Sequence, residues 1–116
     1  MTPYVLVVDD DQAFRGLAAR VLAALGIGEV VEAGTFASAL EAAARFEPVA
    51  VLVDVGLPDG DGVKLATQLA ASPWRPRVVL TSSDLEAATR AGATPFVPKD
   101  RLADEALRSL LAGGEE

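Results

Sequence analysis

Acidic side chains follow two of the aliphatic segments in this 116-residue sequence. Three consecutive aspartates, residues 9–11, come directly after one segment, and Asp54 comes directly after another. Thr81 and Lys99 follow two further segments of the same kind. Carboxylates brought together repel one another and raise one another's pKa unless a cation lies among them. Oxygen ligands without histidine or cysteine favour a hard cation, so the sequence predicts a Mg²⁺ site if these segments meet.

Each of these polar residues also has an ordinary structural interpretation. We expect Asp11 to lie at a helix N-terminus, where the helix dipole favours an acid. A purely structural explanation is disfavoured for Asp9 and Asp10, because nothing in the packing of a buried aliphatic strand requires an aspartate at its end. Lys99 is one of only two lysines, and its place after the last aliphatic segment favours an ion pair or a phosphate contact over a solvated position.

The elements that must position these residues are short β-branched segments alternating with alanine-rich ones. The β-branched segments are Tyr4–Val8, Glu29–Glu32, Val49–Val53, Arg77–Leu80 and Pro95–Val97. Strand–helix alternation repeated five times predicts parallel strands joined by right-handed crossovers, with helices on both faces. The fold class is therefore an α/β three-layer sandwich. Pro95 and Pro98 place the last strand at a sheet edge, since proline cannot donate to the ladder. The carboxyl ends of such strands line the crevice where these folds bind ligands.

Larger apolar residues recur at helical spacing within the alanine-rich segments. The four stripes are Phe14, Leu17, Val21 and Leu25; Phe36, Leu40 and Ala43; Val63, Ala66 and Leu69; and Leu102, Ala106 and Leu110. Gly26 has the position of a helix C-cap. Thr35, Asp61 and Asp84 have the positions of N-caps.

The composition excludes several functions. Without histidine or cysteine there is no Ser–His or Cys–His nucleophile, no thiolate or imidazole zinc site, no disulfide and no phosphohistidine on this chain. A net charge of −7 disfavours direct binding of nucleic acid. The aliphatic runs are strand-sized and no signal-like segment opens the chain, so no membrane association is predicted. We expect an acidic cytoplasmic domain.

Four motifs in order carry a family resemblance. They are Val-Val-Asp-Asp at 7–10, Val-Asp-Val-Gly-Leu-Pro at 53–58 with Asp-Gly at 61–62, Leu-Thr-Ser at 80–82, and Phe-Val-Pro-Lys at 96–99. With these motifs the sequence resembles the receiver domain of bacterial two-component response regulators over essentially its whole length. The resemblance implies a flavodoxin-like (βα)5 fold with a five-stranded parallel sheet in the order 2-1-3-4-5. It also implies a receiver domain over residues 1–112, with 113–116 as a tail or linker stub.

The resemblance further implies the site. Asp54 would be phosphorylated in a Mg²⁺-dependent reaction, with Asp10 as a direct metal ligand. Asp9 would bind the metal directly or through water, and the backbone carbonyl of Gly56 would be a further ligand. The chain would be a signalling phosphoacceptor that catalyses only its own phosphorylation and dephosphorylation. Its donor must be external, a sensor histidine kinase or a phosphotransfer protein, because this chain has no histidine.

A switch is implied by the same resemblance. Thr81 and Lys99 would hold oxygens of the acyl phosphate, and Ser82 is small enough to leave the phosphoryl group access. Thr81 would move toward the phosphate and open space for the aromatic residue Phe96, which otherwise is simply a core residue. The resemblance also implies that the fourth helix, fifth strand and fifth helix form the output face, through which a homodimer could form.

Three departures from the family pattern bear on these expectations. Lys99 is followed by Asp100 rather than proline, so this peptide is expected to be trans and Lys99 could be placed differently; Asp100 is expected to cap the last helix. The stretch Ser82–Ala91 predicts a fourth helix about one turn short. Gly56 has no side chain to position a water, which leaves Ser83 as the nearby candidate.

Smaller features and rivals complete the interpretation. Asp59 and Asp61 are expected to cap the third helix, and Trp74 to anchor a loop. The alternatives are a degenerate receiver that only docks a partner, a Mg²⁺-dependent aspartate-nucleophile phosphatase, and a flavin-binding module. The phosphatase has acids two residues apart, as at 9 and 11, but needs a cap domain for which this chain is too short. Three aspartates would repel a flavin phosphate. The Met1 start favours a complete single-domain regulator.

Overall fold

A five-stranded parallel sheet forms the centre of the protein, which a computed structural model describes over residues 3–84, 92 and 94–101. Its strands are β1 (Tyr4–Val8), β2 (Glu29–Ala33), β3 (Ala50–Asp54), β6 (Arg77–Ser82) and β7 (Phe96–Pro98). They lie in the order β2-β1-β3-β6-β7. This confirms the predicted order, and β7 with its prolines lies at an edge as predicted. The expected fourth helix, the last apolar stripe and the tail at 113–116 lie outside the described residues.

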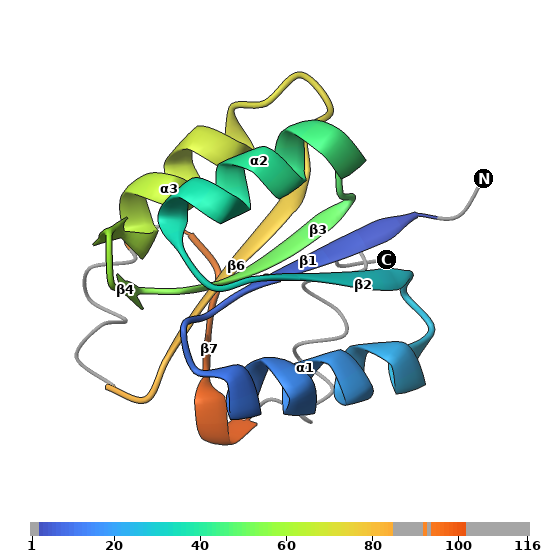
Figure 1. Ribbon diagram of the computed structural model, residues 1–116, viewed down its shortest axis with the longest axis vertical. Coiled ribbons are helices and arrows are strands. Elements are labelled where there is room, and N and C mark those ends of the chain that lie inside the picture. The colour runs from blue at the N-terminus through green and yellow to red at the C-terminus, as the bar shows by residue number, and fades with distance from the viewer. Residues whose placement is uncertain (1–2, 85–91, 93, 102–116) are drawn as a thin grey trace.

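Helices cover both faces of the sheet (Figure 1). The structure describes α1 (Gln12–Leu25) on one face, and α2 (Phe36–Phe46) with α3 (Gly62–Ala70) on the other. A short hairpin of β4 (Gly56–Leu57) and β5 (Gly60–Asp61) links β3 to α3, and a 3₁₀ turn, η1 (Lys99–Arg101), follows β7. None of the helices in these described ranges is long and apolar enough to cross a membrane.

Strand alternation divides the core into two clusters, because successive side chains point to opposite faces. The α2/α3-side cluster includes Leu6, Val8, Val51, Val53 and Leu80 from the strands, with Ala39 and Leu65 from the helices. The α1-side cluster includes Val5, Val7, Leu52, Val79 and Val97 from the strands, with Ala18 and Leu22 from α1. β1 and β3 are buried along nearly their whole length, as parallel central strands should be.

Two members of the predicted helix stripes, Leu17 and Leu40, are wrong, whereas the other members in α1 and α2 are buried or pack against the core. Leu17 is 45% exposed and Leu40 is 38% exposed, whereas Ala18 and Ala39 are fully buried. Small side chains let α1 and α2 approach the sheet closely, so alanine takes the central contact and the larger residue moves toward solvent. Val49 is also exposed, because β3 begins at Ala50.

In α1, α2 and α3, the helices that the structure describes, the caps match the predictions with one exception. Gly26 ends α1 with a φ of 71°, and Thr35 and Asp61 cap α2 and α3 with their side chains. Asp59 does not cap the third helix as expected. Its two carboxylate oxygens accept hydrogen bonds from the first backbone N–H groups of α2, at Phe36 (2.7 Å) and Ala37 (3.1 Å). These bonds lower the pKa of Asp59.

Candidate functional site

Four polar side chains share one face of the sheet at its carboxyl edge. Asp9 lies two residues beyond Val7 in β1. Asp54 and Thr81 are register partners at the ends of β3 and β6, and Lys99 lies two residues beyond Val97. The period-2 alternation of strands therefore points all four toward the α1 side. The convergence predicted from the strand ends is confirmed.

Three carboxylates form a cluster at this edge. One oxygen from each of Asp9, Asp10 and Asp54 lies within 4.8 Å of the other two. Asp9 is fully buried, Asp54 is 7% exposed and Asp10 faces solvent. Asp11 lies outside the cluster and caps α1 through hydrogen bonds from Ala13 N–H and the next residue, which confirms its structural interpretation. An all-oxygen set of this kind suits a hard divalent cation.

The ammonium of Lys99 lies among these acids. Its Nζ is 2.7 Å from Asp9 Oδ2 and 3.6 Å from Asp54 Oδ2. It also lies 4.5 Å from the centroid of the Phe14 ring in α1. Burial alone would lower the pKa of Lys99, but the bond to Asp9 and the charges of Asp54 and Asp11 outweigh it and raise that pKa. Lys99 is therefore a fixed positive charge at neutral pH.

Asp54 has the opposite balance of forces. Burial raises its pKa, and the nearby Asp9 charge raises it further. The Lys99 ammonium and a weak hydrogen bond from Gly56 N–H, at 3.4 Å, lower the pKa without compensating fully. The Asp54 carboxylate is thus poorly solvated and short of positive charge, so it favours an approaching cation or electrophile.

Asp9 is held by groups that sequence reasoning missed. Its Oδ1 accepts a hydrogen bond from Asp11 N–H at 2.9 Å. Its backbone carbonyl accepts one from Arg15 Nη1 at 2.6 Å, and Arg15 also pairs with Glu32 of β2 at 3.2 Å. A Cβ at Gly34 would come within 3.1 Å of the same guanidinium. The only sequence signal for Arg15 is its place one turn after the N-cap, on the side of α1 that faces β2.

The comparisons with known proteins agree with this arrangement. The sequence matches the response regulator receiver domain over residues 5–112. The chain belongs to this family. It is 39% identical over 113 residues to the transcriptional regulatory protein KdpE of Mycobacterium tuberculosis, covering 93% of this chain and 49% of that protein. The receiver domain thus spans about half the length of the curated relatives it matches.

Solved structures share the fold of this receiver domain. A CheY-like receiver domain from Methylobacillus flagellatus has a TM-score of 0.79 at 24% identity, covering 95% of this chain and 99% of that one. A putative response regulator from Chloroflexus aurantiacus has a TM-score of 0.78 at 25% identity, covering 97% and 99%. The flavodoxin-like fold is confirmed. The chain has the phosphoacceptor role of receiver domains in two-component signalling, and response regulators work with histidine kinases. The docking, phosphatase and flavin alternatives are not favoured.

The receiver domain's expected switch residues lie on both faces of the sheet. Thr81 is fully buried, and its hydroxyl has no hydrogen-bond partner within the described residues. Ser82 is buried on the other face, where its hydroxyl accepts from Asp84 N–H at 3.0 Å. Phe96 is half-buried and packs against the α2/α3-side cluster. Whether Asp84 caps a following helix lies outside the described residues.

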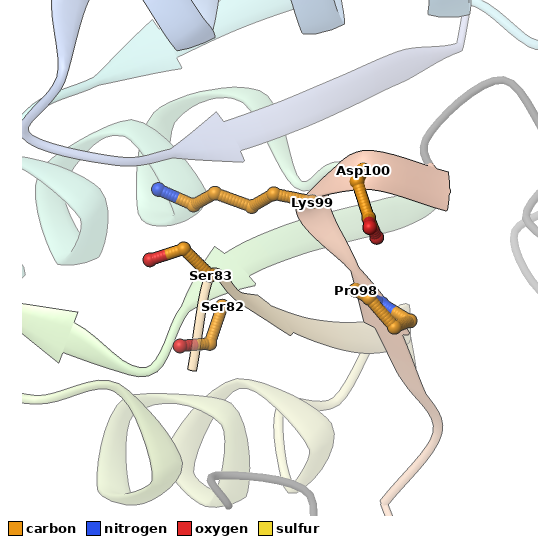
Figure 2. A pocket seen from close by; sticks show the side chains of 5 residues that line it. All are labelled: Ser82, Ser83, Pro98, Lys99 and Asp100. Atoms are coloured by element: carbon orange, nitrogen blue, oxygen red, sulfur yellow. The ribbon is translucent and has the colours of Figure 1, made fainter. Parts of the chain in front are cut away.

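A cavity of about 280 Å³ opens beside Lys99 at the ends of β6 and β7. It is lined by Ser82, Ser83, Pro98, Lys99 and Asp100. Figure 2 shows the Lys99 side chain and the Ser83 hydroxyl extending to the same side, away from Asp100. The Lys99–Asp100 peptide is trans as expected, and Lys99 still reaches the acids.

The hairpin after Asp54 is packed tightly against β3. Gly62 N–H donates to Val55 O at 2.8 Å, and a Cβ at Gly62 would collide with the backbone carbonyl of Asp54. Gly56 is exposed within this hairpin, one residue beyond the buried Val55. The Asp-Gly pair at 61–62 therefore serves two purposes, since Asp61 caps α3 and Gly62 lets the backbone come this close.

Proposed function

We propose that this receiver domain accepts a phosphoryl group on Asp54 from a phosphohistidine of a sensor histidine kinase or phosphotransfer protein. One observation carries the proposal: the Asp54 carboxylate lies between two acids and one ammonium, and its pKa is raised. This is the arrangement expected where an anionic phosphoryl group arrives together with a divalent cation. The chain contains no histidine, so the donor must be another protein or domain.

The oxygen ligands that this site offers fit Mg²⁺. Asp10, Asp54 and the backbone carbonyl of Gly56 would be direct ligands, with Asp9 binding directly or through water. When bound, Mg²⁺ supplies positive charge that neutralises oxygens of the transferred phosphoryl group. Asp9 is fully buried, its Oδ1 accepts a hydrogen bond from Asp11 N–H and its Oδ2 pairs with Lys99, so this carboxylate is oriented before any ion arrives.

The chain's own residues divide the transfer between them. A carboxylate oxygen of Asp54 attacks phosphorus in line, forming the P–O bond as the P–N bond to the donor imidazole breaks. The electron pair of that bond leaves with the imidazole, which takes up a proton. Lys99 and the Thr81 hydroxyl hold phosphoryl oxygens during this step and afterwards. In dephosphorylation, water attacks phosphorus, the P–O bond to Asp54 breaks, and the carboxylate and inorganic phosphate are released. Gly56 has no side chain to position that water, whereas the exposed Ser83 has a hydroxyl that can.

The signalling step follows from the buried hydroxyl of Thr81. A buried hydroxyl without a partner is costly, and within the described residues that of Thr81 has none, so an acyl phosphate on its register partner Asp54 offers Thr81 a hydrogen bond. Movement of Thr81, permitted by the small Ser82, frees space that Phe96 takes up. The output is a change on the face that includes β7, with a homodimer as one use of that face.

The wider assignments are part of the same proposal. Residues 1–112 form the receiver domain and 113–116 a tail or linker. The domain works in the cytoplasm, and its net charge of −7 supports a role without direct contact to nucleic acid or membrane. Its partners are therefore proteins that carry or read the phosphoryl group.

The test is phosphorylation by acetyl phosphate with Mg²⁺, followed by intact-mass spectrometry under conditions that preserve acyl phosphates. We expect one added phosphoryl group in the wild type and none in Asp54→Asn or in the presence of a chelator. Lys64→Met, at an exposed position of α3, is the matched control and should be modified normally. No adduct in the wild type, or an adduct that persists in Asp54→Asn, would refute the proposal.

A further inference from the structure

The Lys99 ammonium has an aromatic contact opposite its acids. Its Nζ lies 4.5 Å from the Phe14 centroid, close enough for a cation–π interaction, and 2.7 Å from Asp9 Oδ2. The Lys99 side chain is 19% exposed, so water screens this contact only in part. Phe14 is itself half-buried and packs at the margin of the α1-side cluster.

Phe14 is fixed by the same loop that carries the acids. Its backbone N–H donates to the capping carboxylate of Asp11 at 3.3 Å, and Asp11 N–H donates to Asp9 at 2.9 Å. The ring therefore sits in the first turn of α1, on a backbone tied directly to Asp9. Lys99 belongs to a distant part of the sequence and meets Asp9 and Phe14 together only in the folded protein.

We propose that Phe14 is a positioning residue for Lys99 in the phosphorylation of Asp54. The inference rests on the proposed function and extends it to a residue outside the acid cluster. An ammonium has three N–H donors and no acceptor. A carboxylate partner takes up one of those donors, whereas a ring face attracts the charge without requiring a directed N–H bond. Phe14 thus holds Lys99 near Asp54 and leaves N–H groups free for phosphoryl oxygens.

The sharpest test changes the ring's charge distribution without changing its shape. Phenylalanine analogues with one, two and three ring fluorines, incorporated at position 14, weaken the cation–π attraction stepwise. We expect the rate constant for phosphorylation by acetyl phosphate with Mg²⁺ to fall stepwise, reaching about 2- to 30-fold with three fluorines. Phe14→Leu should fall by a similar factor, and Phe14→Tyr should retain most of the rate.

A second measurement does not depend on activity. In the wild type, ring currents of Phe14 should shift the Lys99 CεH₂ proton resonances upfield, and Phe14→Leu should remove that shift while the protein remains folded. The matched control is the same fluorinated series at Phe46, whose ring centroid lies 5.4 Å from the Arg45 guanidinium carbon and whose ring is tilted by 56° against that of Tyr4. Fluorination at Phe46 should leave the phosphorylation rate unchanged.

The outcomes separate this inference from the function on which it rests. No phosphoryl adduct in the wild type would overturn the proposed function. A wild type that is phosphorylated, with a rate that does not change across the Phe14 series, would overturn only the positioning role. Equal losses at Phe14 and Phe46 would also overturn it, because they would indicate a general effect of fluorination on the fold. A stepwise fall at Phe14 alone, together with the lost proton shift in Phe14→Leu, supports it.

Discussion

Replacing Lys99 by methionine removes the ammonium from the acid cluster and keeps a side chain of similar length. Two effects of opposite sign should follow. The fully buried Asp9 carboxylate loses its partner at 2.7 Å, so the metal-free protein should be less stable. The same cluster loses a positive charge that competes with a divalent cation, so Mg²⁺ should bind more tightly.

The size of the first effect follows from the ion-pair distance. Unit charges 2.7 Å apart interact by about 1.5 kcal/mol in water and about 6 kcal/mol at an effective dielectric constant of about 20. Breaking a buried pair by removing one partner typically costs about 3–5 kcal/mol. The Lys99 side chain keeps 19% exposure, which admits some screening. We therefore expect the free energy of unfolding to fall by about 2–3 kcal/mol without metal.

The second effect is smaller, because the Lys99 side chain is 19% exposed and water screens part of its repulsion of a cation. Relief of the repulsion should be worth about 1–2 kcal/mol, which is about 5- to 30-fold in the dissociation constant for Mg²⁺. Since the ion stabilises the native state by mass action, Mg²⁺ should raise the stability of Lys99→Met more steeply than that of the wild type. At high Mg²⁺ concentration the two proteins should converge in stability.

Urea unfolding over a Mg²⁺ series measures both effects in one experiment, with calorimetry as an independent measure of affinity. Lys64 is the chain's other lysine and lies exposed on α3, so Lys64→Met is the matched control. That control should change stability by no more than about 0.5 kcal/mol. Unchanged or weaker Mg²⁺ binding in Lys99→Met would refute the view that the ammonium and the cation share one site.

Three further predictions concern stability and pH. The pKa of Asp54 is raised above 3.8 in the native state, so native stability is lost as pH rises from 3.8 through the native pKa and the carboxyl ionises. Asp54→Asn should therefore be more stable than the metal-free wild type at neutral pH in urea titrations. The stability of this variant should no longer respond to Mg²⁺. Asp59 has a lowered pKa, so the stability it contributes is present above 3.8 and lost as pH falls through the native value; Asp59→Asn should lower the Tm at neutral pH, and equal Tm values there would refute the cap. Gly62→Ala should cost about 1–3 kcal/mol in urea unfolding, because its Cβ meets the Asp54 carbonyl; an unchanged midpoint would contradict that close approach.

Much of the fold could be predicted because its signals are local. The five strands are short β-branched runs, and the structure places each within about two residues of its predicted bounds. Local chemistry also predicts caps such as Thr35 and Gly26, which depend on their own side-chain oxygen or on a left-handed φ. The convergence of the acids needed only the knowledge that carboxyl ends of parallel strands share one edge.

The contacts that could not be predicted depend on which side of each helix faces the sheet. The stripe of large apolar residues in α1 included Leu17, but Ala18 is buried instead and Leu17 is 45% exposed. That orientation of α1 also decides which first-turn residues reach the site. The stripe predicted that Phe14 packs toward the sheet, but neither its contact with Lys99 nor that of Arg15 with Asp9 could be predicted. Asp59 is a similar case, because its partners at the start of α2 lie 22 and 23 residues earlier in the chain.

The position of Lys99 shows why these missed contacts matter for the site. The family resemblance led us to expect that Asp100, in place of proline, could move the lysine. Instead Lys99 lies against Asp9 and Phe14, so electrostatic attraction from the end of β1 and from α1 holds its ammonium even though Asp100 follows it. An ammonium held there partly neutralises the acids before any cation or phosphoryl group arrives. The Lys99 ammonium therefore offsets part of the repulsion among the three carboxylates, so a divalent cation would enter a site whose side chains are already gathered rather than assemble a new one.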